Sequence, residues 1–511
     1  MPQYLSPGVY VEEVEAGSRP IEGVGTAVAA FVGMAADGPF NEPTLVTNWS
    51  QFTQSFGEFL PGSYLAHSVY GYFMNGGGSC YIVRIGQTNG SSAPARGELR
   101  SGNDATLGAY HISAIEGGPA GNDLTVEVTD ASGGEGAPED PFKIVVRKGG
   151  KVEEEFDNVT AKKGKLNVVT VVNAKSKLIK IEEIGKAGAL DVPAKASVSL
   201  AGGGSPTPAR LTPDDYVGDA SRRTGFGGLE AIDAVTMVCV PDLMAAYQRG
   251  LVDNEGLQAV QLGMIAHCEN MGDRVAILDP PPNLNAQQIR EWRVDKAGYD
   301  SKYAALYWPW IKVFDPASGQ NVFVPPSGHM AGIWGRSDDT RGVHKAPANE
   351  VVRGAISLEI QITKAEHDLL NPHGINCIRA FPGRGIRVWG ARTLSSDPAW
   401  RYINIRRLFN YLEESILNGT QWAVFEPNDH ALWAKMRRTI TAFLFNEWRK
   451  GALFGLTPDQ AYFVKCDDET NPAESIDAGM VVCEIGIAPV KPAEFVIFRL
   501  SQYSGGAALT E

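Results

Sequence analysis

The sequence has few features of a nucleic-acid-binding or membrane protein. Its 46 lysine and arginine residues are outnumbered by 59 aspartate and glutamate residues, which gives a net charge of -13. A protein that binds a phosphate backbone needs a cationic face, so this balance argues against a nucleic-acid partner. The longest apolar stretch, residues 27–36, is interrupted by Gly33 and is far shorter than the ~20 residues that cross a bilayer. Direct membrane insertion is therefore not expected.

Cysteine is scarce and follows no motif. The chain has six cysteines and no CxxC pair: Cys80, Cys239, Cys268, Cys377, Cys466 and Cys483. Isolated thiols with apolar flanks are typical of buried free cysteines, so disulfide bonds are not expected. Residues 1–8 lack the basic start and apolar segment of a secretory signal, which predicts synthesis in the cytosol.

Motifs of the common enzyme classes are also absent. There is no GxxxxGK[ST] phosphate loop, no HExxH zinc motif and no GxSxG nucleophile elbow. The closest histidines, His367 and His373, fit a loop or helix surface better than a metal site, which needs three or four convergent ligands. A dispersed Ser, His and Asp set remains open. The sequence predicts no catalytic residue, no metal ligand and no cofactor.

The length and the pattern of elements predict several domains. At roughly 150 residues per domain, 511 residues correspond to about three or four domains. Residues 86–204 are rich in glycine, serine, alanine and charge, and resemble a separate small β domain. Its expected strands lie at residues 124–128, 142–146, 166–172 and 178–184.

After a glycine-rich linker, strands and helices alternate. Strands are expected at residues 235–240, 274–278 and 303–314, and helices at residues 255–271 and 286–294. This order is typical of a parallel sheet covered by helices, whose ligands often bind at the carboxyl ends of strands. Asp242 and Asp279 stand at such ends, although each is beside a proline and fits strand termination or helix capping. An α/β hydrolase-like enzyme with its site near these residues is the alternative interpretation.

The last third contains a helix with unusual charges. Residues 397–419 begin with an Asp-Pro cap and repeat apolar residues on one face, which predicts an amphipathic helix. Arg406 and Arg407 lie in its first half, and Glu413 and Glu414 lie in its last turn. This placement opposes the preference of the helix dipole. Either an outside partner or ion pairs within the subunit would explain it.

Each end of the chain carries a strand-like run without a partner nearby in sequence. The two runs consist of Val9, Tyr10, Val11, Glu12 and Glu13, and of Phe495, Val496, Ile497, Phe498, Arg499 and Leu500. If they fold back, they are ordinary edge strands. If they reach outward, each completes the sheet of a neighbouring copy by strand addition. Such a contact joins different surfaces on successive copies, and repetition without closure yields a helical array.

Several segments resemble the tail sheath family of contractile phages and related injection systems. The resemblance lies in residues 4–13, 75–84, 326–350, 381–389, 393–398, 419–422 and 489–495. Together these segments cover roughly the first 85 and the last 185 residues, and as a set they are highly specific.

The resemblance implies a structural subunit that polymerises helically around an inner tube and contracts without nucleotide. Its partners would be further copies of itself, the inner tube protein, and baseplate and tail terminator or cap proteins. The carboxy-terminal domain would face the tube, which would give Arg406, Arg407, Glu413 and Glu414 a reason to display charge. The protein would be made in the bacterial cytoplasm and become part of a phage tail or a phage-like contractile injection particle.

The expected fold is therefore α+β and α/β, in several domains. The core shared by the family would be built from both chain ends, with a small β-rich insertion and a βαβ-type middle domain. The expected parts are an extended arm at 1–22, an inner core at 23–88 with 341–488, a β-rich outer domain at 89–205, an α/β middle domain at 206–340, and a C-terminal arm strand at 489–511.

Overall fold

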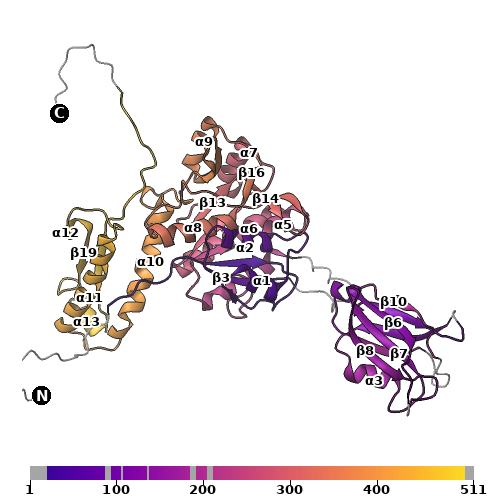
Figure 1. Cartoon of the computed structure of the whole chain (residues 1–511). Helices are drawn as coiled ribbons and strands as arrows, with labels where there is room; N and C mark the ends of the chain where they lie inside the picture. The colour runs from indigo at the N-terminus through magenta and orange to yellow at the C-terminus, as the bar shows by residue number, and fades with distance from the viewer. Residues whose placement is uncertain are drawn as a thin grey trace, which may run out of the picture. The chain divides into compact units, whose positions relative to one another are not determined.

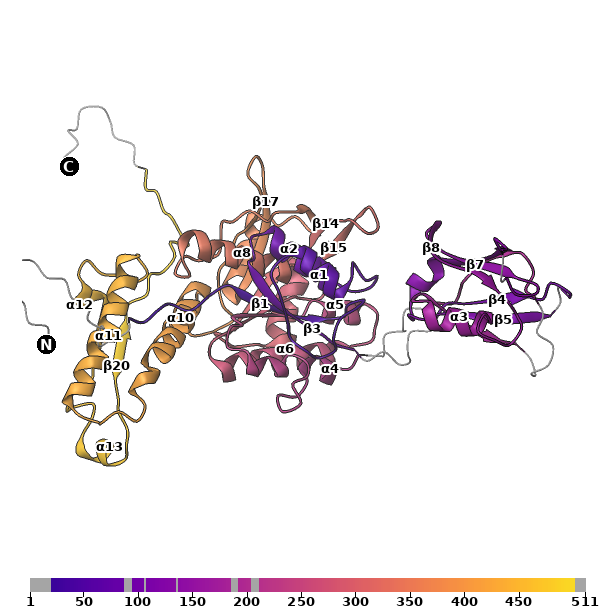
Figure 2. The ribbon, with the colours of Figure 1, turned by 60° about the horizontal axis from the view of Figure 1, so that its bottom comes forward.

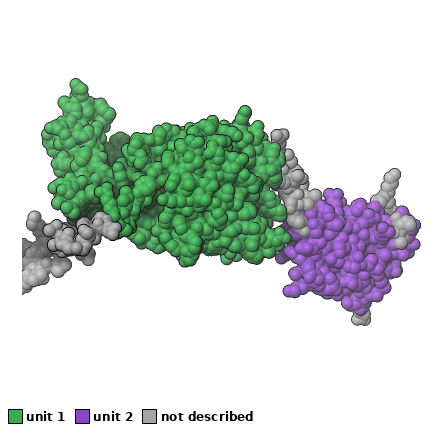
Figure 3. All heavy atoms as spheres, turned by 90° about the horizontal axis from the view of Figure 1, so that it is seen from above, with its two compact units in different colours: residues 1–85, 211–511 green, residues 86–210 purple. Residues whose placement is uncertain are grey.

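The structure is a computed structural model that describes residues 20–86, 94–104, 107–134, 137–184, 192–203 and 211–500. The chain forms two compact units, one of residues 1–85 with 211–511 and one of residues 86–210 (Figure 3). Both contain helices and sheets, which confirms the expected mixed α/β class with several sheets. The expected β-rich insertion at 89–205 falls within the smaller unit.

The larger unit is built on an eight-stranded sheet with the order β18-β17-β13-β12-β11-β1-β3-β2. Its strands are β1 (Val28–Gly33), β2 (Thr44–Val46), β3 (Ser79–Arg84), β11 (Met237–Cys239), β12 (Val275–Leu278), β13 (Ala304–Trp308), β17 (Ile375–Phe381) and β18 (Gly385–Val388). The pairs from β17 to β3 are parallel, and the outer strands β2 and β18 are antiparallel to their neighbours. Parallel strands are ordinarily buried on both faces, which accounts for the continuous apolar runs of β11, β12 and β13.

Helices cover both faces of this sheet (Figures 1 and 2). Their bounds are α1 (Trp49–Phe56), α2 (Leu65–Met74), α4 (Pro213–Val217), α5 (Asp242–Gln248), α6 (Asn254–Met271), α7 (Ala286–Glu291), α8 (Ser327–Arg341) and α9 (Lys364–Leu370). Ala30 and Val32 of β1 pack with α5, α6 and α7, whereas Ala29 and Phe31 pack with α1, α2 and α8. Alternate residues of one strand therefore belong to two separate cores.

The structure does not divide the larger unit as expected. Residues 23–88 and 206–340 were expected in different domains, but β1 pairs in parallel with β11, with Ala29 opposite Met237. The expected strand at 303–314 is also interrupted at Pro309, which has no N–H for a ladder hydrogen bond. Its second half is β14 (Ile311–Asp315), which forms a separate three-stranded sheet with β15 (Gln320–Val324) and β16 (Ala355–Leu358).

The smaller unit contains two antiparallel sheets that share one apolar core. Their strands are β4 (Arg96–Arg100), β5 (Gly108–Ala114), β6 (Leu124–Asp130), β7 (Phe142–Lys148), β8 (Lys151–Val159), β9 (Ile179–Glu183) and β10 (Ser197–Ser199). The expected strand at 166–172 is wrong, because α3 (Val168–Lys175) lies there. The Asn167 side chain accepts the N–H of Thr170 and caps this helix. Val168 and Val172 are buried, and their helical spacing outweighs the β propensity of valine.

The C-terminal part of the larger unit is mostly helical. It contains α10 (Ile403–Thr420), α11 (His430–Arg449), α12 (Pro458–Ala461), α13 (Ala473–Asp477) and the paired strands β19 (Tyr462–Lys465) and β20 (Glu484–Ile487). The helix expected from Asp397 begins six residues later, at Ile403, because Asp397 caps a short helical turn at Pro398–Trp400 instead. Leu408 and Leu412 of α10 pack against Phe443 and Leu444 of α11.

Candidate functional site

The C-terminal arm, residues 495–500, has its apolar side chains in solvent. These residues form neither a helix nor a strand in the described chain. Phe495, Val496, Ile497, Phe498 and Leu500 are 72%, 69%, 78%, 85% and 97% exposed, and Arg499 is exposed as well. A contiguous exposed apolar run of this kind marks a surface that another molecule covers.

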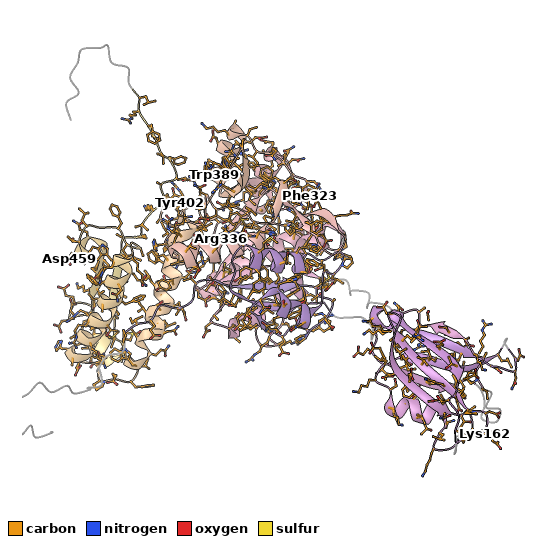
Figure 4. All side chains as sticks on the ribbon, viewed as in Figure 1. Lys162, Phe323, Arg336, Trp389, Tyr402 and Asp459 are labelled. Atoms are coloured by element: carbon orange, nitrogen blue, oxygen red, sulfur yellow. The ribbon has the colours of Figure 1, made fainter. Side chains whose placement is uncertain are left out.

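The arm leaves the protein at a partly buried ionic anchor, the side chain of Glu494. Arg392 holds both of its carboxylate oxygens, with Nε at 2.8 Å from Oε1 and Nη2 at 2.7 Å from Oε2. The Asn371 amide and the Tyr402 hydroxyl, the latter labelled in Figure 4, each donate a further hydrogen bond at 2.8 Å. Burial opposes ionisation of Glu494, but the hydrogen bonds from Arg392, Asn371 and Tyr402 outweigh it and lower the pKa of Glu494.

The root of the N-terminal arm lies against α10. The strand expected at Val9–Glu13 falls outside the described residues, which begin at Pro20. Ile21 joins the core between α10 and α11 and lies where a side chain at Gly419 would clash. The Val24 N–H donates to Ser415 Oγ at 3.1 Å. The chain therefore enters the larger unit along the helix that carries the predicted surface charges.

The strands β19 and β20 form an antiparallel pair with no third strand in the described chain. Tyr462 and Val464 face the α10–α11 core, whereas Phe463 on the opposite face is 58% exposed. Phe454 and Leu456, in the loop before α12, are 72% and 91% exposed. A two-stranded sheet is marginal by itself and offers unpaired edges to further strands.

The structure does not place Arg406 at the surface as a tube-facing residue. Its side chain is 2% exposed and ends 3.2 Å from Glu413, with Nε donating to Asn410 Oδ1 at 2.6 Å. Its guanidinium also stacks over Trp400 at 4.5 Å and over Tyr303 at 4.7 Å. An arginine with its donors and its planar face occupied in this way is a structural residue of its own subunit.

Arg407 is likewise occupied within the subunit. It forms a bidentate ion pair with Asp338 of α8, at 2.5 and 2.9 Å, and donates to the Thr26 carbonyl at 2.8 Å. Of the four charges predicted to face a tube, only the glutamates extend outward. Glu413 is 56% exposed, and Glu414 is half-buried and accepts from Asn418 at 2.8 Å.

The carboxylates proposed for the alternative enzyme site are helix caps. Asp242 is fully buried and accepts N–H groups of Tyr64 and Leu65 at the start of α2, with the Met34 N–H at 2.5 Å. Burial raises the pKa of Asp242, and these hydrogen bonds oppose the shift. With its oxygens used by backbone donors, Asp242 has a structural role.

Asp279 has the same role at the start of α8. It accepts the Ser327 N–H at 2.9 Å and the Ser327 hydroxyl at 2.5 Å. Burial raises its pKa to about 7, and the bonds from Ser327 oppose that shift. In the described residues, no group of three or more His, Cys, Asp or Glu side chains is placed to hold a metal ion. Within the same residues, no helix has the length and apolar character needed to cross a bilayer.

The sequence shows the apolar run at residues 495–500 but not the contacts that hold its base. Arg392 and Asn371 are 102 and 123 residues away from Glu494, so local pattern gives no sign of their contact. The available signal was Glu494 itself, a single acid between Pro492 and an apolar run. The pairing of β19 with β20 was missed for the same reason, because even its closest partners, Lys465 and Glu484, lie 19 residues apart along the chain.

An exposed apolar arm and an open two-stranded sheet in one chain are typical of proteins that bind other chains by strand addition. Comparison with known proteins gives the family. The chain belongs to the phage tail sheath family, since residues 223–394 match the phage tail sheath protein central domain and residues 395–502 match the phage tail sheath C-terminal domain. The family is one of structural proteins, as the resemblance implied.

Individual relatives agree with this placement. The tail sheath protein of Burkholderia phage BcepMu is 24% identical over 518 residues, covering 96% of this chain and 95% of its own length. The tail sheath protein of Vibrio phage KVP40 is 27% identical over 262 residues, or 47% of this chain, and this match spans only 38% of its own length.

Solved structures share the fold. The helical sheath of the anti-feeding prophage in its contracted state has a TM-score of 0.58 and 23% identity, covering 97% of this chain and 99% of that one. The sheath complex of an extracellular contractile injection system, PVC, also in its contracted state, has a TM-score of 0.57 and 23% identity. It covers 98% of this chain and 99% of that one.

Proposed function

We propose that this protein polymerises helically around an inner tube by exchanging terminal strands, and that the polymer contracts to drive the tube through a target envelope. The observation that carries the proposal is the C-terminal arm, whose five apolar side chains are 69–97% exposed although Glu494 holds its root firmly. An arm that is fixed at Glu494 and exposes its apolar side chains fits a segment that another copy of the protein covers.

The paired strands β19 and β20 are the proposed acceptor. Each has an edge without a further strand in the described chain, and an added strand would form main-chain hydrogen bonds worth about 1 kcal/mol net apiece. The exposed rings of Phe454 and Phe463 lie at this sheet and would be covered by the arriving arms. Residues 9–13 at the N-terminus are proposed to supply a second donated strand.

Donation to a different surface on the next copy is a heterologous contact, and its repetition without closure builds a helix of subunits. Contraction then requires the larger unit to move as a rigid body while the arms keep neighbours joined. The extensive double core around the central sheet supports such rigidity. Free energy stored at assembly would drive the movement, so neither nucleotide nor cofactor takes part.

Further partners are proposed from the same resemblance: an inner tube protein, a baseplate and a tail terminator or cap. One comparison supports the wider assembly, because a solved structure of the anti-feeding prophage baseplate matches 98% of this chain with a TM-score of 0.57. For the tube, we propose Glu413 and Glu414 of α10 as its contacts, because these two of the four predicted charges extend outward. The protein would act as part of a phage tail or a phage-like particle.

A pair of truncations tests the strand exchange. A chain that ends at Glu494 keeps the anchor and loses the apolar run, whereas a chain that ends at Leu500 keeps both. We expect the first to be a folded monomer that forms no sheaths in electron micrographs, and the second to form hollow cylinders. Sheaths of normal length from the chain that ends at Glu494 would refute the role of the arm.

Deletion of residues 1–19 tests the other donated strand. This change removes no residue of the described cores, so the subunit should stay folded and soluble while sheath formation is lost. Circular dichroism checks the fold, and electron microscopy checks assembly. Cylinders indistinguishable from those of the full chain would contradict donation by the N-terminus.

A further inference from the structure

Two thiols face each other where the β19–β20 pair ends. Lys465 is opposite Glu484 in this pair, so the next residues, Cys466 and Cys483, are also opposite each other. Opposed residues of an antiparallel pair project from the same face of the sheet. Here both cysteines belong to the apolar cluster around Trp433 of α11.

The two thiols interact with each other. Burial is the main cause that raises the pKa of Cys483 to about 12, and the adjacent Cys466 sulfur, which accepts its S–H, adds to the shift. Burial also raises the pKa of Cys466, against hydrogen bonds from Asn471 and Cys483. Opposed residues of an antiparallel pair have Cα atoms about 4.5–5.5 Å apart, within the range that a disulfide spans.

We propose that Cys466 and Cys483 form a disulfide when the protein meets a peroxide, a two-electron oxidant. Cys483 is partly exposed and reacts first, whereas Cys466 is fully buried. The Cys483 thiolate attacks one peroxide oxygen, the O–O bond breaks, and a sulfenic acid forms as water leaves. The Cys466 thiolate then attacks that sulfur and expels its hydroxyl as a second water. Two thiols lose two protons and two electrons, and one hydrogen peroxide becomes two waters.

The bond would join β19 to β20 across the open end of their pair and close the segment 467–482 into a loop. The joined strands are the ones that receive the arms in the proposed function, so this consequence, unlike the bond itself, rests on that proposal. A particle released from a reducing cytosol enters surroundings in which disulfides persist. Oxidation would then stiffen the joint between copies after assembly is complete.

Peptide mapping of the full chain tests the bond. Reduced protein is exposed to hydrogen peroxide, remaining thiols are alkylated after denaturation, and digestion proceeds without reductant. We expect a Cys466–Cys483 linked peptide pair lighter by two hydrogens, with Cys268 alkylated. Its rate of formation should rise with pH, because the thiolate is the reacting form and both pKa values are raised. Oxidation of Cys483 alone, or links to other cysteines, would overturn the proposal.

Serine variants test the consequence. Hydrogen exchange of β19 and β20 should slow by about tenfold or more on oxidation of the unmodified chain. It should slow equally in Cys268→Ser, a matched control at another buried cysteine, and not at all in Cys466→Ser or Cys483→Ser. A linked peptide without slower exchange would contradict the stiffening. A linked peptide with slower exchange in a chain that never forms sheaths would support the disulfide and defeat the proposed function.

Discussion

Strand β12 and the C-terminal arm hold similar apolar side chains in opposite surroundings. In β12, Val275, Ala276, Ile277 and Leu278 are at most 1% exposed, because helices of the same chain cover both faces of the sheet. In the arm, the apolar residues between 495 and 500 are 69–97% exposed. The same residue types therefore stabilise a subunit in one region and are available to join subunits in the other.

The largest expected effect comes from the ion pair that joins α10 to this covered region. Arg407→Ala leaves Asp338 buried without its partner, and breaking a buried pair in this way costs about 3–5 kcal/mol. Urea unfolding of the monomer measures the loss. Arg401→Ala, at an exposed arginine on the same segment, is the matched control and should change the free energy of unfolding by less than about 0.5 kcal/mol. Equal stability of the two variants would contradict the burial of Arg407.

Matched isoleucines test the comparison directly. Ile277→Ala removes buried side-chain atoms from β12 and should lower the free energy of unfolding by about 2–5 kcal/mol. Ile497→Ala should change it by less than about 0.5 kcal/mol, since that side chain is 78% exposed in the single chain. Sheath formation should respond in the opposite way, with Ile497→Ala raising the protein concentration needed for assembly. A monomer destabilised by Ile497→Ala would show that the arm is covered by its own subunit.

A smaller effect is expected at Glu494, where the covered part of the chain meets the exposed arm. Glu494→Gln replaces charge-assisted hydrogen bonds, which are worth about 1.5–3 kcal/mol, by neutral ones. Hydrogen exchange of residues 488–496 should rise in this variant while the central sheet stays protected. Glu474→Gln, an exposed glutamate on α13, should leave both regions unchanged.

The anchor also predicts a dependence on pH. Because the pKa of Glu494 is lower in the folded protein than in the unfolded chain, its contribution is fully present above the unfolded value and is lost as pH falls through the folded value. Exchange of the arm root should therefore increase in acid. The Glu494→Gln variant should lack this step, and a step of the same size in that variant would assign it to another group.

The smallest effect on the subunit is expected at the outward face of α10. Glu414→Lys changes a half-buried side chain that, among the described residues, accepts a hydrogen bond only from Asn418, so stability should change by less than about 0.5 kcal/mol. Co-sedimentation with the tube protein should nevertheless weaken, more than sheath polymerisation does. Glu474→Lys provides the same charge change elsewhere, and tube binding equal in the two variants would remove Glu414 from the proposed contact.

The sequence predicted best the elements with a continuous apolar run or a clear helical period. The strand expected at 274–278 is β12 (Val275–Leu278), and the helix expected at 255–271 is α6 (Asn254–Met271). Prediction from local pattern failed where capping and burial outweighed the propensity of the residues. The valines of 166–172 suggested a strand, yet the cap at Asn167 and burial at helical spacing favour α3.

The pairing of strands that lie far apart in the chain could not be predicted from local sequence pattern. No feature of residues 28–33 indicates that β1 lies between β3 and β11, because that choice depends on how the whole sheet is filled. The same holds at the candidate site. The apolar run at 495–500 was visible in the sequence, whereas the burial of Arg406 and Arg407 depends on aromatic rings and carboxylates, such as Trp400 and Asp338, supplied by other segments.

Because Glu494 is held in place, the length of the segment beyond it sets how far the arm can reach. Six residues, 495–500, span about 20 Å when fully extended at about 3.3 Å per residue. In the proposed polymer, the receiving edge of a neighbouring copy must therefore begin within that radius of Glu494, both before and after contraction. The geometry of one carboxylate thus limits how far adjacent subunits can separate while remaining joined.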